Sequence, residues 1–191
     1  MKIAKGQPEY LKQKKKRELG ITFFEFAIIA GLILVGYTQT GTKLNWFTFA
    51  AILGCLPASK QLVSVITIFP HKSIDISFAD ELQKKATVVT SLYDLVITSR
   101  EQIMPIDCMV ISNCTICGYT HSFKVDVDAT AKYIKDMLAS NHLDRISVKI
   151  FTDFNAFISR AEGMNNIAMI EKMEPDERTF KIRQIILNNS L

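Results

Sequence analysis

Three cysteines and one histidine lie close together near the middle of the chain. Cys108, Cys114, Cys117 and His121 have the spacing C-x5-C-x2-C-x3-H. Thiolate and imidazole are the ligands of structural zinc, and a C-x-x-C pair can also carry thiol redox chemistry. The spacing therefore makes a zinc- or thiol-dependent domain one alternative for the function of this region.

The elements predicted around these residues argue against both chemistries. If 114–121 is a strand, its side chains alternate between faces, so Cys114 and Cys117 point apart and cannot share a tetrahedral metal. A reactive C-x-x-C pair is favoured at a helix N-terminus, and no helix is predicted directly after Cys117. Because free cysteines are common buried residues in a reducing compartment, we expect small core side chains here and no cofactor.

The apolar pattern becomes periodic after Pro70 and predicts an α/β domain over 71–191. The predicted helices cover 77–91, 126–139, 153–163, where Gly163 ends the helix, and a C-terminal segment that begins near Pro175. The predicted strands cover 93–99, 106–112, 114–121, 146–152 and 167–170, with Pro105 in a loop and Asn113 at a turn. This order implies a mixed sheet that is flanked by helices.

The first part of this order resembles a known family. A helix ending at Leu92 and a strand over 93–99 precede Ile106-Asp-Cys-Met-Val-Ile-Ser112 and a strand that reaches Gly118-Tyr-Thr-His-Ser122. This arrangement resembles the nuclease-related domain of the restriction-endonuclease-like fold. In that family one strand begins with a metal-binding Asp, which Asp107 matches, and a neighbouring strand ends in Glu-x-Lys, which is absent from this sequence.

The resemblance implies a divergent nuclease-like hydrolase or an inactive relative. Without the second carboxylate and the lysine, metal-assisted phosphodiester hydrolysis lacks most of its ligands, which leaves Asp107 as a lone catalytic candidate. The sequence also lacks a glycine-rich phosphate loop, G-x-S-x-G and H-E-x-x-H. We therefore expect a binding or regulatory domain with a protein partner, and keep the hydrolase as the alternative.

Two apolar segments before this domain predict a transmembrane hairpin over 21–69. The first segment, 21–37, would span roughly 26 Å as a helix, close to the ~30 Å hydrocarbon core of a bilayer. Glu25 lies one turn inside this segment, near enough to the interface to reach the headgroups or to be protonated. The length and composition predict a membrane-spanning helix.

The second segment begins at Leu44 and has Trp46 as an interfacial aromatic anchor. We expect its helix to end near Leu62, with Lys60 reaching the headgroups and 63–69 lying at the interface or on the soluble domain. The alternative is one tilted helix over 44–69 with a polar patch inside it.

A basic cluster precedes the first segment and sets the predicted orientation. It consists of Lys12, Lys14, Lys15, Lys16 and Arg17. The flank 1–20 holds seven lysines or arginines, whereas the turn 38–43 holds one. Since positive flanks stay cytoplasmic, we expect an integral protein of the cell membrane with both termini in the cytoplasm. The cluster also predicts contact with anionic lipid headgroups.

The net charge of +4 is unevenly distributed along the chain. Residues 1–70 carry nine basic and three acidic side chains, whereas 71–191 carry fourteen and sixteen. The predicted soluble domain is therefore mildly acidic. Non-specific binding of nucleic acid depends on clustered Lys and Arg, so nucleic acid is not a predicted partner.

Overall fold

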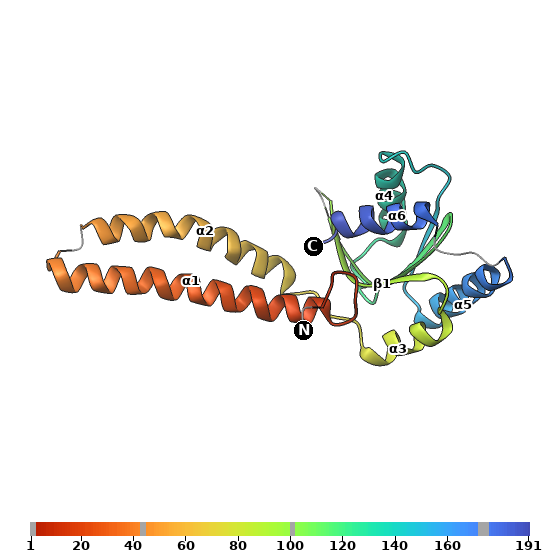
Figure 1. Cartoon of the computed structure of the whole chain (residues 1–191), viewed down its shortest axis with the longest axis horizontal. Helices are drawn as coiled ribbons and strands as arrows, with labels where there is room; N and C mark the ends of the chain where they lie inside the picture. Colours follow the sequence, from red (N-terminus) through yellow and green to blue (C-terminus); the bar gives the residue numbers. More distant parts are fainter. Residues whose placement is uncertain (1–2, 43–44, 100–101, 172–175) are drawn as a thin grey trace. The chain divides into compact units, whose positions relative to one another are not determined.

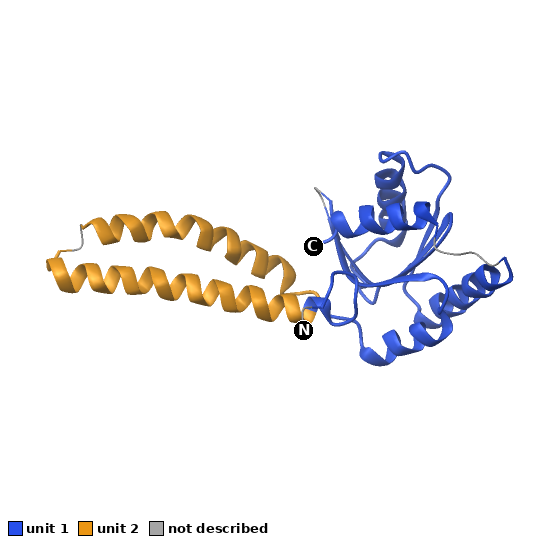
Figure 2. Ribbon diagram, viewed as in Figure 1, with its two compact units in different colours: residues 1–11, 73–191 blue, residues 12–72 orange. Residues whose placement is uncertain are grey.

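The computed structural model describes residues 3–42, 45–99, 102–171 and 176–191. It divides into two compact units (Figure 2). The hairpin unit is Lys12–Lys72, and the α/β unit combines Met1–Leu11 with Ser73–Leu191. The sequence suggested one basic flank over 1–20, but the structure divides that flank after Leu11, because the backbone of Gly6 binds a strand of the α/β unit.

The hairpin unit consists of α1 (Tyr10–Thr40) and α2 (Trp46–Ile68) (Figure 1). Both helices are long and apolar enough to cross a membrane. Helix α1 begins before the predicted apolar segment because the lysine-rich sequence in front of it also consists of good helix formers. Leu44, where the second segment was predicted to start, lies outside the described residues.

Helix α2 runs without a break through Pro57 and on to Ile68. The predicted helix end near Leu62 is therefore wrong, and the alternative of one continuous helix describes this segment better. An internal proline removes a single backbone donor, and the helix can continue beyond it. The polar residues Ser59 and Lys60 are exposed on the helix surface and do not interrupt it.

Small residues hold the two hairpin helices together. Ala51 and Ala58 of α2 are buried in one cluster with Ile29 of α1. A Cβ atom on Gly54 would lie 3.5 Å from Ile29 Cγ1, and one on Gly36 would lie 2.6 Å from Asn45 Oδ1. Small side chains at these positions let the helix backbones approach closely, as they do between membrane helices.

The α/β unit contains a four-stranded mixed sheet in the order β1-β2-β3-β4, which confirms the predicted mixed-sheet α/β architecture. The strands are β1 (Thr90–Thr98), β2 (Ile103–Ser112), β3 (Thr115–Tyr119) and β4 (Ser147–Phe151), with only the β3 and β4 pair parallel. Helices α4 (Val127–Ala139) and α6 (Glu177–Asn188) cover one face, and α3 (Ile76–Lys85) and α5 (Phe154–Ile170) cover the other (Figure 1).

Two regions of this unit differ from the prediction. Helix α3 ends at Lys85 and β1 begins at Thr90, so the predicted helix 77–91 is too long. Helix α5 continues through Gly163 to Ile170, so the predicted strand 167–170 is helical. Both errors come from short apolar runs, which fit a strand and a helix equally well. Pro175, the predicted start of the last helix, lies outside the described residues.

Pro105 lies inside β2 and not in the predicted loop. It is paired with Val96 of β1, whereas β2 pairs with β3 only from Cys108 onwards. Proline is tolerated in a sheet where one side of its strand is unpaired, since no neighbour then needs its missing N–H.

Both ends of the chain cover the free edge of β1. The Tyr93 N–H donates to the Gly6 carbonyl at 2.9 Å, and the Leu191 N–H donates to the Val96 carbonyl at 2.8 Å. Ile97 forms an isolated bridge with Ser190. Covering an edge strand removes a template on which other chains could pair.

Candidate functional site

Two buried aspartates face each other across the middle of the sheet. The β1 and β2 ladder pairs Tyr93 with Cys108 and Leu95 with Ile106, which places Asp94 opposite Asp107. The two residues are 3% and 4% exposed. Buried carboxylates on adjacent strands are costly unless they are hydrogen-bonded, so this pair marks a candidate site.

In both strands, the regular alternation of side chains between the two faces of the sheet is interrupted at these aspartates. Leu92 and Leu95 of β1 lie in the same core cluster, as do Ile106 and Met109 of β2. Residues three apart in a regular strand would point to opposite faces. Asp94 has a φ of 54°, a left-handed conformation that Asp adopts more readily than most residues. The irregularity therefore sits at the acidic pair itself.

Asp94 binds the two stretches of chain that flank the hairpin in sequence. Its carboxylate accepts the Leu11 N–H at 3.2 Å, the Ile74 N–H at 2.9 Å and the Ser73 hydroxyl. The chain leaves the α/β unit after Leu11 and returns to it at Ser73. Burial raises the pKa of Asp94 and the nearby Asp107 raises it further, while these three hydrogen bonds lower it. One carboxylate thus fixes both flanks to β1.

Asp107 holds the imidazole of His121. Its two carboxylate oxygens lie 2.8 and 2.7 Å from His121 Nδ1, and one of them also accepts the His121 backbone N–H at 2.6 Å. The His121 side chain is 48% exposed. A carboxylate at Nδ1 keeps the proton there, which leaves Nε2 as a proton acceptor. The pair has the chemistry of a general base or of a single oriented ligand.

The structure does not bring the four candidate zinc ligands together. Cys108 and Cys117 are buried in the core cluster under α3 and α5. Cys114 lies before β3 and its Sγ is 3.3 Å from Asn113 Oδ1, while His121 binds Asp107. Within the described ranges, no group of three or more His, Cys, Asp or Glu side chains could hold a metal ion.

The buried cysteines have the properties of core residues and not of reactive thiols. Burial raises the pKa of the Cys108 and Cys117 thiols, and a raised pKa lowers the fraction of nucleophilic thiolate. The prediction of small core side chains is confirmed at these two positions. It is wrong for Cys114, which is partly exposed at the turn after β2.

An aromatic cluster covers the sheet next to Asp107. Phe78 of α3 stacks on Phe154 of α5 at 4.2 Å between ring centroids, and Tyr119 of β3 meets Phe154 edge-on at 5.3 Å. Burial raises the pKa of Tyr119 and the Asp107 carboxylate raises it further. The rings give the aspartate an apolar wall on this side.

The predicted membrane-anchor residues all lie on the hairpin helices. Lys14, Lys15, Lys16 and Arg17 belong to α1, Trp46 begins α2, and Lys60 is exposed on α2. Lys15 Nζ donates to the Phe69 carbonyl at 2.8 Å and lies 5.8 Å from the centroid of the Phe69 ring. Arg17 pairs with Glu18 at 2.9 Å, and Gln61 of α2 donates to the other Glu18 oxygen.

Asp94 was not predicted as a site residue. The signal in the sequence is one acidic residue inside the apolar run of Leu92 to Ile97, where a buried strand would otherwise exclude a charge. Its partners at Leu11 and Ser73 are distant in sequence, and they could not be identified from periodicity.

No protein-family model, curated protein or solved structure matches this chain at a significant level. The resemblance to the nuclease-related domain therefore stays a prediction.

Proposed function

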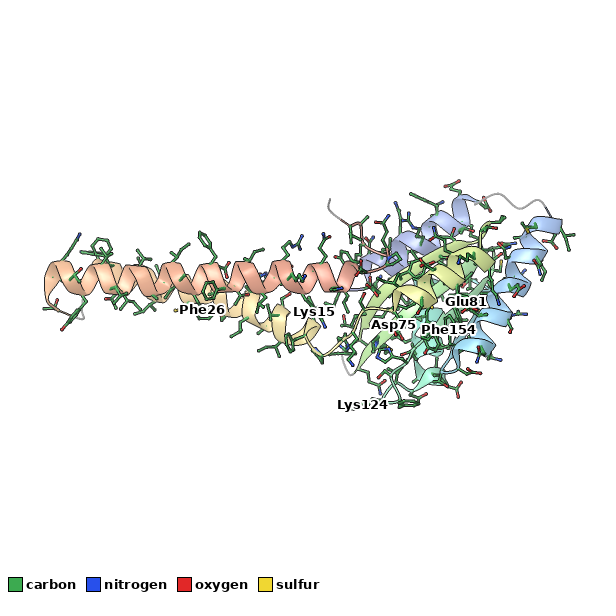
Figure 3. All side chains as sticks on the ribbon, turned by 90° about the horizontal axis from the view of Figure 1, so that it is seen from below. Lys15, Phe26, Asp75, Glu81, Lys124 and Phe154 are labelled. Atoms are coloured by element: carbon green, nitrogen blue, oxygen red, sulfur yellow. The ribbon has the colours of Figure 1, made fainter. Side chains whose placement is uncertain are left out.

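We propose that this chain is an integral membrane protein whose α/β unit acts as a binding or regulatory module at the cytoplasmic surface of the membrane. The observation that carries the proposal is the surface of the hairpin. Its large apolar side chains are exposed, among them Phe23, Phe24, Leu34, Leu56 and Ile66. Phe26, labelled in Figure 3, is a further exposed phenylalanine of this hairpin. Such a surface is unfavourable in water and favourable in hydrocarbon.

The orientation rests on the basic residues at one end of the hairpin. Lys12 and Lys16 are exposed in the first turns of α1, before its apolar part. Such residues favour the cytoplasmic side and attract anionic headgroups, at about 1 kcal/mol for each side chain near the surface. Two spans then return the chain to the same side.

Membrane topology can be tested with reporter insertions. Green fluorescent protein fused at either end of the full-length chain should fluoresce, because it folds in the cytoplasm. Alkaline phosphatase inserted after Thr42 should be active, and the same enzyme fused at the C-terminus should be inactive. Recovery of the chain in the soluble fraction after alkaline carbonate extraction would contradict the proposal.

Exposed apolar residues on the α/β unit support the binding role. Phe123 is 96% exposed and follows His121 by two residues, with Lys124 beside it. An exposed aromatic side chain is the type of residue that is enriched in protein interfaces. The loop after β3 is therefore the proposed contact for a protein partner.

A photo-crosslinking amino acid at position 123 of the full-length, membrane-embedded chain tests this contact. We expect one dominant crosslinked protein, which mass spectrometry would identify. The same probe at Phe180 is the matched control, because Phe180 is also an exposed phenylalanine of the α/β unit. Equal crosslinking patterns from both positions would overturn the assignment of the loop.

The contact between Asp107 and His121 supports a second candidate function, a hydrolase in which His121 is the general base. The motivating observation is the 2.7 Å contact between His121 Nδ1 and the carboxylate. Hydrolysis of ester or phosphodiester substrates that is lost in both H121A and D107N would support this function. Divalent-metal-dependent DNA cleavage abolished by D107A would support its nuclease form.

A further inference from the structure

A cavity of about 650 Å³ lies in the α/β unit, and its lining includes neither Asp94 nor Asp107. The N-terminal segment forms one wall, the turn between α3 and β1 forms a second, and Arg183 of α6 completes the lining. Ser91 and Tyr93 contribute side chains from β1. The volume is within the range of small-molecule sites, which is roughly 300 to 1,000 Å³.

The charge of this cavity is positive. Among the described residues that line it, Arg183 is the only charged one, and no carboxylate faces it there. Over the part of the chain that the structure describes, no hydrogen bond or ion pair engages the Arg183 guanidinium. A guanidinium presents a planar fork of donors that matches two oxygens of a phosphate or carboxylate.

Neutral polar groups surround the arginine. The polar residues Gln7, Gln83, Thr87, Ser91 and Tyr93 line the cavity. The Ser91 hydroxyl is shielded from solvent, and burial raises the pKa of the Tyr93 phenol, which keeps it a neutral donor. Apolar side chains complete the wall: Ile3, Pro8, Ala86 and Val89. The lining therefore combines apolar side chains with polar groups that could orient a ligand.

We propose that this cavity binds a small organic anion, with its phosphate or carboxylate on Arg183 and its neutral polar part on the amides and hydroxyls. This inference concerns the α/β unit alone and does not depend on the proposed membrane function. The cavity is larger than an inorganic phosphate requires, so the favoured ligand carries a polar body of nucleotide or sugar-phosphate size.

The conformation of Gly6 and a backbone hydrogen bond fix the N-terminal segment beside this cavity. Gly6 has a φ of 86°, and a Cβ atom there would lie 3.0 Å from Leu187 and from Leu92. Its carbonyl accepts the Tyr93 N–H, so the segment is fixed to β1 at the cavity wall. The same segment continues in sequence into α1 at Tyr10. Ligand binding should therefore slow amide exchange in residues 3–8.

The test uses full-length protein in detergent micelles and four probes: inorganic phosphate, adenosine monophosphate, glucose 6-phosphate and citrate. Isothermal titration calorimetry measures affinity, and hydrogen exchange reports on residues 3–8. We expect at least one organic anion to bind more tightly than inorganic phosphate. Tighter binding of citrate would identify a carboxylate ligand, and tighter binding of either phosphate ester would identify a phosphorylated one.

Arg183→Gln should weaken binding by about ten- to a hundredfold, the usual effect of losing a charged hydrogen-bonding partner. Lys181→Gln is the matched control, because Lys181 lies on the same helix, pairs with Glu177 and does not line the cavity. If R183Q fails to fold, the near-isosteric T87V replaces it, because Thr87 is exposed and lines the cavity. No binding by any probe, or equal affinity in the cavity variants and K181Q, would overturn the proposal.

Discussion

The hairpin unit and the α/β unit place their large apolar side chains differently. In the hairpin, Phe23 is 77% exposed while Glu18 is 7% exposed. In the α/β unit, Phe157 is fully buried, and the cluster around it is almost entirely apolar. Side chains of the same type, phenylalanine, thus lie outside one unit and inside the other.

This difference is the one expected if the hairpin lies in hydrocarbon, as proposed, and the α/β unit lies in water. Water drives apolar side chains inward, which explains the two apolar clusters on the faces of the sheet. Hydrocarbon does not drive them inward, so membrane helices associate through small residues and interhelical hydrogen bonds. Ala51, Ala58 and the contact between Gln61 and Glu18 follow this second rule.

The largest expected effect is the loss of stability when a phenylalanine is truncated in the α/β unit, compared with the same truncation in the hairpin. Phe157→Ala should lower the free energy of unfolding of the α/β unit by about 3 to 5 kcal/mol, because it leaves a cavity in the core. Phe24→Ala in the hairpin should change it by less than about 0.5 kcal/mol. Urea unfolding of the full-length protein in micelles, followed by near-UV circular dichroism, measures both. Equal losses of stability in both variants would contradict the view that phenylalanine stabilises the α/β unit by burial and the hairpin does not depend on it in this way.

A charge on the outward face of the hairpin should impair insertion into the membrane. Ile28 is exposed near the middle of the apolar part of α1, and Ile28→Asp should cost about 2.5 to 3.5 kcal/mol of insertion free energy. The fraction of chain that resists carbonate extraction measures this cost, with Ile28→Leu as the control. Higher solubility of I28D with an intact fold would mean that this face meets water.

Removing the charge of Asp107 should lower the stability of the fold more than removing the side chain of His121. Asp107→Asn places an amide opposite two donors of His121 and should lower the free energy of unfolding by about 1 to 3 kcal/mol. His121→Ala leaves the backbone hydrogen bond intact and removes an exposed ring, so it should cost less than about 1 kcal/mol. Thermal unfolding of both variants gives the comparison. A larger loss in H121A would show that the imidazole, and not the carboxylate, organises the site.

The smallest expected effect is a pH dependence that belongs to Asp94. Its pKa is raised above the ordinary aspartate value of 3.8, so the folded state holds this proton more tightly than the unfolded state. The resulting stabilisation is fully present at pH values below the ordinary aspartate pKa, and it is lost as the pH rises through the raised pKa of the folded state.

The stability of the wild-type protein should therefore fall relative to that of Asp94→Asn as the pH rises through this window. Unfolding free energies of both proteins, measured at several pH values, test the prediction. Asp128→Asn, at an exposed aspartate on α4, is the control. A constant difference between wild type and D94N across the window would contradict it.

The sequence by itself determined the elements whose signal is local. Apolar length predicted the two long helices, and alternation and helical spacing predicted the mixed sheet with its flanking helices. Asp126 and Asp153 cap α4 and α5, because an aspartate side chain accepts the first free backbone donors of a helix wherever it occurs. These features depend on neighbours within a few residues.

Only the tertiary structure decided the acidic pair and its partners. Asp94 and Asp107 are thirteen positions apart and meet because β1 and β2 are antiparallel, while Leu11 lies 83 positions from the carboxylate it binds. The cavity likewise combines residues 3–8 with Arg183. Hydrogen bonds and cavities between distant segments depend on how the strands pair and the termini pack, and this information is not present in any single stretch of sequence.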